Sequence, residues 1–134
     1  NLGQEHPIRQ LEQAMQAAPT TAGAQLPQLA QQIWQVHIDE TIRQYIVRLV
    51  MATRTGEMSG EIEHAVSPRG SLALAAAAKA RAYLQGRDYA MPEDVSALAP
   101  DALAHRMVLT WRSVAEGRTA RAVIADLLDR VDPL

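Results

Sequence analysis

The 134-residue chain contains no cysteine and no phenylalanine, and its aromatic residues are two tryptophans and three tyrosines. Without cysteine, neither a disulfide framework nor a thiolate metal site can form, so a reducing compartment is permitted and we expect a cytoplasmic protein. No apolar run approaches the roughly 18 residues that a membrane span needs. No secretory signal pattern opens the chain. We therefore expect no membrane span.

Positive charge is also scarcer than a nucleic-acid partner would require. The chain has 13 basic and 15 acidic residues, which gives a formal net charge of −2. Binding to nucleic acid depends on clustered cations, so this balance argues against a dedicated nucleic-acid binder. Hydrophobic residues make up 48% of the chain, which fits one domain with a packed core. Because alanine is abundant and aromatic residues are few, we expect a thin core between closely spaced helices.

Helical periodicity dominates what is present. The clearest helix is predicted from Asp39, a suitable N-cap, to about Thr55, and Gly56 ends it. Its apolar residues recur at i, i+3, i+4, i+7 and i+8, and they are Ile42, Tyr45, Ile46, Leu49 and Val50. This spacing is typical of a helix with one buried face.

Other segments extend the helical pattern along the chain. They predict helices over residues 7–18, from Leu26 onward, and over 67–85, 92–98, 100–105 and 119–131. Residues 56–66 are expected to form a polar connection. Residues 107–110 are expected to be extended, with 36–38 as a candidate neighbour. The predicted fold is all-α, a small bundle of about six helices with at most a short two-stranded β element.

Ser67-Pro68-Arg69 is the most informative short segment. Ser67 suits an N-cap and Pro68 suits the first helical position. Arg69 then lies in the first turn, where the helix dipole disfavours a cation by roughly 0.3–1 kcal/mol. An anion would relieve this arrangement, since a helix start and an arginine both favour phosphate oxygens. The alternative is that Arg69 extends into solvent or pairs with a nearby acid.

The remaining polar and aromatic residues favour structural roles. The four histidines lack the spacing of a metal site, and they are His6, His37, His64 and His105. Glu93 and Asp94 follow Pro92 in the first turn of a predicted helix, where acids commonly complement the helix dipole. Trp34 and Trp111 are expected to pack in the core or at its edge. No metal site is predicted.

Several motifs occur in one order along residues 36–131. They are Val36-His37-Ile38-Asp39, Tyr45-Ile46-Val47-Arg48-Leu49-Val50, Ala52-Thr53-Arg54, Ser67-Pro68-Arg69-Gly70-Ser71-Leu72-Ala73-Leu74, Gly86-Arg87-Asp88-Tyr89, Pro92-Glu93-Asp94-Val95, and Leu98-Ala99-Pro100-Asp101 through His105-Arg106. As a set they resemble the C-terminal lid of MoxR-type AAA+ ATPases. The resemblance implies that residues 1–35 are a helical lead-in from an ATPase core and that residues 36–134 form the lid domain.

The resemblance also implies a nucleotide-binding residue. In that family the arginine of the Ser-Pro-Arg motif is sensor 2, which reaches the terminal phosphates of ATP at the junction of core and lid. The corresponding residue is Arg69, with Ser67 and Pro68 building the helix start and Gly70 letting neighbouring backbone approach. Where the family often has Gly-Ala before this motif, the chain has Ala65-Val66, which stiffens the approach.

The resemblance further implies that the full-length protein is an ATPase that uses ATP and Mg²⁺. The chain itself has no G-x-x-x-x-G-K-[ST] loop and no apolar strand ending in paired acids, so it is not expected to hydrolyse ATP alone. The implied partners are its own core domain, neighbouring subunits of a ring, expected to be a hexamer, and von Willebrand factor A-domain proteins. The implied role is that of a chaperone-like machine that remodels or assembles other proteins.

Alternatives remain open at this point. One is the lid of a magnesium-chelatase-type AAA+ subunit. Another is a free-standing helical adaptor or helix-turn-helix module, built from the predicted helix pair 92–98 and 100–107. Arg54 and Arg87 lie near predicted helix ends, where Arg87 could fold over a helix C-terminus. A contact with nucleotide or with a neighbouring subunit is a further option for both.

Overall fold

A computed structural model describes residues 28–133 of the chain. The described elements in chain order are α2 (Gln28–Trp34), α3 (Glu40–Thr55), the 3-10 helix η1 (Glu57–Glu61), β1 (Ile62–His64), α4 (Arg69–Leu84), α5 (Pro92–Leu103), the 3-10 helix η2 (Ala104–Arg106), β2 (Val108–Leu109), α6 (Trp111–Ala115) and α7 (Ala120–Arg130). This arrangement confirms the predicted all-α fold with one small β element. The helix predicted over 7–18 lies outside the described residues.

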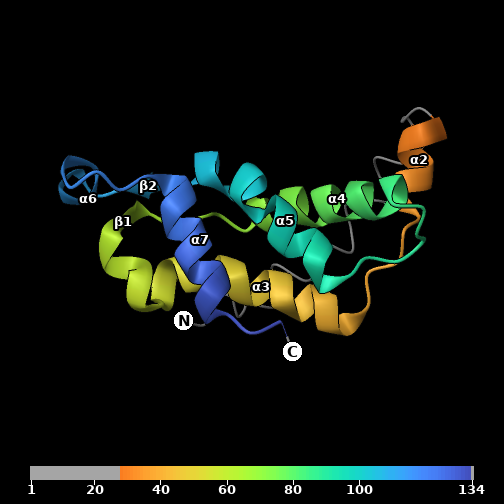
Figure 1. Ribbon diagram of the computed structural model, residues 1–134, viewed down its shortest axis with the longest axis horizontal. Helices are drawn as coiled ribbons and strands as arrows, with labels where there is room; N and C mark the ends of the chain where they lie inside the picture. The colour runs from red at the N-terminus through yellow and green to blue at the C-terminus, as the bar shows by residue number, and fades with distance from the viewer. Residues whose placement is uncertain (1–27, 134) are drawn as a thin grey trace, which may run out of the picture.

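The helices form an elongated bundle (Figure 1). α3 runs along one side, α4 and α5 pack against each other along the other side, and α7 contacts both α3 and α5. α2 packs against α4 at one end of the bundle, while β1, β2 and α6 lie at the other end. Among the described residues, no helix is both long enough and apolar enough to cross a membrane.

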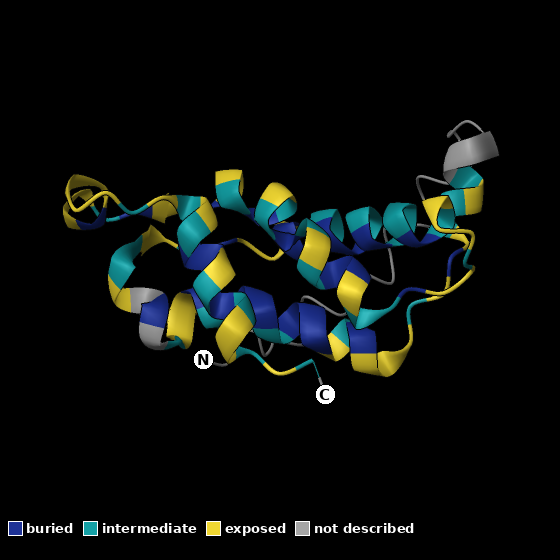
Figure 2. Ribbon diagram, viewed as in Figure 1, coloured by how far each residue is buried: buried dark blue, intermediate teal, exposed yellow. Residues whose placement is uncertain are grey.

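α3 forms as the sequence predicts. The Asp39 side chain accepts a hydrogen bond from the Ile42 N–H at 3.0 Å, which satisfies a backbone donor that the helix cannot satisfy itself. At the other end, the Gly56 N–H donates to the Ala52 carbonyl. The predicted apolar face is buried, as the dark blue stripe along α3 shows (Figure 2). α3 therefore supplies a large part of the core.

Alanines bring α4 and α5 close together. Ala78 and Ala82 of α4 are fully buried, as is Ala99 of α5. Small side chains at such positions let helix backbones approach closely, and the aliphatic side chains of Leu74 and Val95 fill the remaining space. Among the described residues, the core is largely aliphatic, with Tyr45 its one buried aromatic side chain, as the scarcity of aromatic residues predicts.

α5 differs from the prediction of two separate helices over 92–98 and 100–105. The structure has one helix that continues through Pro100. Proline removes one helical hydrogen bond and its ring crowds the preceding turn, which is why a boundary was predicted there. Packing outweighs this effect, because Val95, Ala99 and Leu103 lie four residues apart on one buried face that spans Pro100. The helix pair on which the helix-turn-helix alternative depends is therefore absent.

The β element also differs from the prediction. Residues 56–66 were expected to be a polar connection, but they contain η1 and β1, and β1 pairs with β2 in antiparallel fashion through Ile62 and Leu109. The expected partner of the extended segment 107–110, residues 36–38, lies elsewhere: His37 forms an isolated bridge with Tyr89. Backbone pairing is set by tertiary packing, which short segments do not encode locally.

Two features near the C-terminal end complete the fold. α6 was not predicted; Thr110 caps it by accepting from the Ser113 N–H at 3.2 Å. Trp111 is 79% exposed, so the expectation that it packs in or beside the core is wrong. α7 lies within the predicted range 119–131, and Thr119 is its N-cap, accepting from the Ala122 N–H at 3.1 Å.

Candidate functional site

The candidate site is the start of α4. The helix begins at Arg69, and Pro68 occupies the cap position with helical dihedral angles (φ −54°, ψ −29°) and no side-chain capping bond. The Gly70 N–H donates to the Ser67 carbonyl at 2.9 Å, and the Ser71 N–H donates to the Pro68 carbonyl at 3.1 Å. The prediction that Ser67 caps with its side chain is therefore wrong, and α4 begins at Arg69, one residue later than predicted, although Pro68 already has helical dihedral angles. Because Pro68 is already helical, the Ser67 backbone carbonyl takes the place of the side chain.

This geometry changes what the helix start can offer an anion. Two N–H groups of the first turn, those of Gly70 and Ser71, are already bonded within the chain. The helix start is therefore a closed turn rather than an open cradle of donors. An anion placed at this point would meet the Arg69 guanidinium and the helix dipole rather than these two N–H groups.

Arg69 is exposed on the surface of the bundle. Among residues 28–133, its side chain forms no hydrogen bond and no ion pair, whereas Arg81, Arg87 and Arg118 each pair with a carboxylate. The alternative that Arg69 pairs with a nearby acid does not hold within this part of the chain. Ser67 and Pro68 are exposed beside it, so the Ser-Pro-Arg motif faces outward as a unit.

Gly70 lies directly beneath this exposed motif and is buried. A Cβ atom at this position would lie 2.2 Å from Val66 Cγ1 and 3.4 Å from Leu103 Cδ2. Packing therefore favours glycine here, but the atoms that approach it belong to side chains, whereas the resemblance implies an approach of neighbouring backbone. This contact fixes the first turn of α4 against the end of α5 and the preceding loop.

Val66 links this loop to α3. Its N–H donates to Thr53 Oγ1 at 3.2 Å, and its carbonyl accepts from Arg54 Nη2 at 3.0 Å. Its side chain is fully buried against Gly70. Both backbone polar groups and the side chain of Val66 are thus held by residues on either side of the loop. Sequence reasoning singled out Arg54 only as a residue near a helix end, and nothing in its local pattern indicates a bond to a residue twelve positions away.

A polar cavity of about 430 Å³ opens beside the same loop. It is lined by Thr53, Arg54, Ile62, Glu63, His64 and Ala65. Among the described residues, no group of three or more histidine, aspartate or glutamate side chains could hold a metal ion. His6 lies outside the described residues. The structure therefore places two cations, Arg54 and Arg69, at or near the loop that leads into α4.

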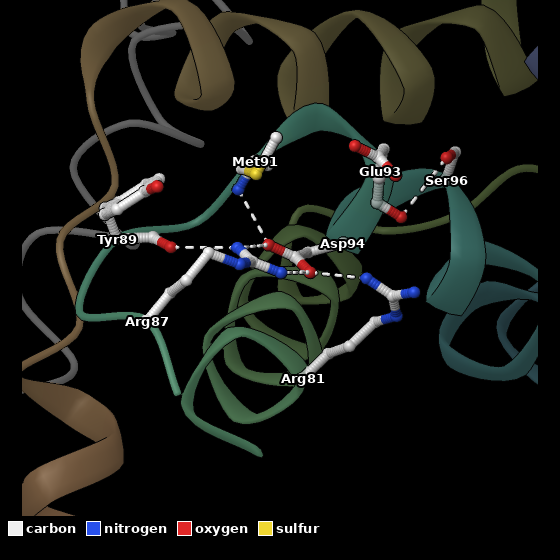
Figure 3. A network of polar contacts seen from close by, with 7 residues as sticks. All are labelled: Arg81, Arg87, Tyr89, Met91, Glu93, Asp94 and Ser96. Carbon is white, nitrogen blue, oxygen red and sulfur yellow. Dashed lines mark hydrogen bonds and ion pairs between the residues drawn. The ribbon is translucent and has the colours of Figure 1, made fainter. Parts of the chain in front are cut away.

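A second polar cluster lies at the other end of α4 (Figure 3). Asp94 is fully buried and accepts from Arg87 at 2.7 and 2.8 Å, from Arg81 at 2.6 Å and from the Met91 N–H at 2.7 Å. Burial alone would raise the pKa of Asp94, but the hydrogen bonds from Arg87, Met91 and Arg81 outweigh it and lower the pKa to about 2. Asp94 is therefore an ionised anchor between α4 and α5.

Two residues of this cluster, Asp94 and Arg87, differ in their contacts from what the sequence predicts. Asp94 does more than complement a helix dipole, because its side chain, at the third position of α5, also accepts from the N–H of the cap residue Met91, as in one half of a capping box. The Arg87 side chain pairs with Asp94 in the first turn of α5 and donates to the Tyr89 carbonyl, rather than bonding the C-terminus of α4. Arg81 is twelve residues beyond Arg69 on α4, which corresponds to roughly 18 Å along the helix axis. The polar cluster around Asp94 is therefore separate from the Ser-Pro-Arg motif at the start of α4.

Comparison with known proteins shows the family to which the chain belongs. A family model for the AAA lid domain matches residues 51–127. Protein YeaC of Bacillus subtilis, which is uncharacterized, is 38% identical over 126 residues, covering 94% of this chain and 37% of that protein. Chaperone MoxR1 of Mycobacterium tuberculosis is 41% identical over 93 residues, covering 65% of this chain and 25% of that protein.

A solved structure gives the same result. The crystal structure of a protein from Cytophaga hutchinsonii, proposed to be an ATPase, matches with a TM-score of 0.71 and 36% identity, over 75% of this chain and 32% of that chain. The chain belongs to the AAA lid domain family, since the family model covers more than half of it. Within that family, the relatives named MoxR and MoxR1 confirm the resemblance to the lid of MoxR-type AAA+ ATPases. The chain spans 20% to 37% of the length of these relatives.

Proposed function

We propose that this lid supplies Arg69 as the sensor 2 arginine, which contacts the terminal phosphates of ATP held by an adjoining AAA+ core. The observation that carries the proposal is that Arg69 is exposed at the start of α4 and has no bonding partner among residues 28–133. The helix dipole disfavours an unpaired cation at this end of a helix. The negative charge of a phosphate beside Arg69 would offset this cost, because it attracts both the guanidinium and the helix start. Arginine also matches phosphate oxygens with two parallel donors.

The donor set of the lid fits the polyphosphate of ATP and leaves Mg²⁺ to the core. The guanidinium of Arg69 suits phosphate oxygens, whereas the described residues hold no cluster of metal ligands. When bound, ATP with Mg²⁺ supplies the phosphoryl group that is transferred to water. The contribution of this chain is to bind and orient the outer phosphates and to exclude water by closing over them. The lid alone is not proposed to hydrolyse ATP.

The proposed consequence of this contact is a nucleotide-dependent movement of the lid. Arg69 interacts more strongly with a triphosphate than with a diphosphate, because the outermost phosphate is the one it would reach. A ligand shifts a conformational equilibrium only through such differential contact. The closed arrangement of lid on core is therefore favoured with ATP and released after hydrolysis.

For the whole protein, we propose a chaperone-like AAA+ ATPase that forms a ring, expected to be a hexamer, and remodels or assembles other proteins in the cytoplasm. The name of the relative chaperone MoxR1 supports the chaperone-like role. The MoxR names of the relatives favour this branch over a magnesium chelatase subunit. Partners with a von Willebrand factor A domain belong to the same proposal.

The test is an Arg69→Ala change in the protein that contains this lid together with its core. Loss of a hydrogen-bonded charge contact is expected to remove about 1.5–3 kcal/mol of transition-state stabilisation, or roughly ten- to a hundred-fold in kcat/KM for ATP. Arg112→Ala is the matched control, because Arg112 is also an exposed arginine with no side-chain bond among the described residues. Unchanged ATP turnover and unchanged nucleotide-dependent closure in Arg69→Ala would overturn the proposal.

A further inference from the structure

We propose that Thr53 and Arg54, at the end of α3, are positioning residues that orient Arg69 through Val66. This inference rests on the proposed role of Arg69 in binding the phosphates of ATP. It assigns to the last turn of α3 a part in nucleotide response that the Ser-Pro-Arg motif alone does not contain.

The first step of the argument is the fixed backbone of Val66. Only Ser67 and Pro68 lie between Val66 and Arg69, so the direction in which the chain leaves Val66 sets where α4 begins. Thr53 Oγ1 accepts from the Val66 N–H at 3.2 Å and itself donates to the Val50 carbonyl at 2.6 Å, so its hydroxyl is oriented from both sides. Thr53 is only 1% exposed, which shields this pair of bonds from water.

The second step is the use that Arg54 makes of its charge. Its Nη2 donates to the Val66 carbonyl at 3.0 Å, and among the described residues it forms no ion pair with a carboxylate. Glu63 lines the same cavity as Arg54. A surface arginine that bonds a main-chain carbonyl instead of such an acid holds the loop by a charge-assisted bond.

The third step is the side chain of Val66. It is fully buried, and its Cγ1 occupies the space that a Cβ at position 70 would need, at 2.2 Å. The loop therefore cannot shift towards α4 without displacing the first turn that carries Arg69. With the N–H and the carbonyl bonded to α3 and the side chain against α4, one residue connects the end of α3 to the start of α4.

Because this connection sets the position of the first turn of α4, it determines whether the Arg69 guanidinium lies within reach of a phosphate. Contacts of this kind depend steeply on position, since a misplacement of about 1 Å can lower a rate by two orders of magnitude. A residue that only stabilised the fold would lower the melting temperature without a specific effect on ATP. A positioning residue instead changes the strength of the Arg69 contact.

The experiment is a double-mutant cycle in the protein that contains this lid and its core. The variants are Arg54→Met, Arg69→Ala and the double change, with kcat and KM for ATP and melting temperature measured for each. We expect Arg54→Met to lower kcat/KM by about ten-fold in the wild-type background. In the Arg69→Ala background it should have little further effect, because residues that act through one contact are not additive.

Conservative variants separate positioning from folding. Arg54→Lys retains a donor for the Val66 carbonyl and is expected to recover most of the activity. Thr53→Val removes the hydroxyl at nearly constant volume and should lower kcat/KM, whereas Thr53→Ser retains it and should not. Arg43→Met is the matched control, because Arg43 lies on the same helix and pairs with the exposed Glu40 at 2.7 Å.

The outcomes distinguish this inference from the proposed function. If Arg69→Ala has no effect on ATP turnover, the proposed function is wrong and the inference fails with it. If Arg69→Ala lowers turnover but Arg54→Met does not, or if the two effects are additive, the inference alone is overturned. A loss in Arg54→Met that Arg54→Lys does not recover would also contradict it.

Discussion

Arg87 and Asp94 form a two-pronged ion pair across the turn between α4 and α5, with nitrogen–oxygen distances of 2.7 and 2.8 Å. Arg81 approaches the same carboxylate from α4 at 2.6 Å. Asp94 is completely buried, and the structure leaves none of the buried side-chain polar atoms that it describes without a partner. A buried carboxylate is tolerated because it is bonded from several directions, and its removal should therefore be costly.

Asp94→Ala should lower the free energy of unfolding by about 2–4 kcal/mol, because it leaves two arginines facing a vacated site and frees the Met91 N–H. Urea unfolding of the 134-residue chain, followed by far-ultraviolet circular dichroism, measures the change. Glu93→Ala is the control, since Glu93 is the exposed acid in the same helical turn. Its loss should cost less than about 1 kcal/mol. Equal losses in both variants would show that Asp94 acts only as a helix-dipole partner.

The same carboxylate predicts a dependence of stability on pH. The pKa of Asp94 is lowered to about 2 in the folded protein, from an ordinary value of 3.8. A lowered carboxyl pKa contributes stability that is fully present above about pH 4 and is lost as the pH falls towards 2. The difference in unfolding free energy between the wild type and Asp94→Asn should therefore be constant near neutral pH and shrink below pH 4. A difference that stays constant down to pH 2 would contradict this reading.

Gly70→Ala should destabilise the lid, although alanine ordinarily favours a helix over glycine by about 0.5–1 kcal/mol. The added Cβ would lie 2.2 Å from Val66 Cγ1, so the loop or the helix start must shift. We expect a loss of about 1–3 kcal/mol, as for other overpacked sites, measured by urea unfolding. Gly60→Ala serves as control because a Cβ there meets nothing within 4 Å. A stabilised Gly70→Ala variant would show that Val66 moves aside freely.

Two leucines of α4 offer a matched pair for the core. Leu74 is fully buried, whereas Leu84 is 80% exposed at the end of the same helix. Leu74→Ala should lower the free energy of unfolding by about 2–5 kcal/mol, from lost burial and the cavity left behind. Leu84→Ala should change it by no more than about 0.5 kcal/mol. Comparable losses in the two variants would mean that α4 does not present the face seen in the structure.

The sequence predicted the helical elements where local signals agree. Asp39, an apolar face with helical spacing and Gly56 all indicate α3, and helical periodicity over residues 119–131 indicates α7. The alanine-rich run indicates α4, although its exact start was misjudged because Ser67 looked like a side-chain cap. The family resemblance came from the order of short motifs, which survives changes in single residues.

Other features depend on contacts between distant residues and could not be predicted. Pro100 is a local signal for a helix boundary, but burial of Val95 and Leu103 on one face keeps α5 continuous. The pairing of β1 with β2 joins residues more than forty positions apart, and two- or three-residue strands carry no periodicity of their own. Trp111 looks like a core residue by type, yet it lies on the short helix α6, at one end of the bundle (Figure 1).

The sequence by itself determined that this chain is a small helical lid and that Arg69 stands at the start of one of its helices. Hydrophobic spacing, caps and motif order are local properties, and they suffice for both statements. The tertiary structure decided which polar groups are free and which are bonded: Arg87 is held by Asp94, Arg54 by the Val66 carbonyl, and Arg69 by nothing in residues 28–133. Burial and hydrogen bonding depend on which segments meet in space, and chain order does not encode this locally.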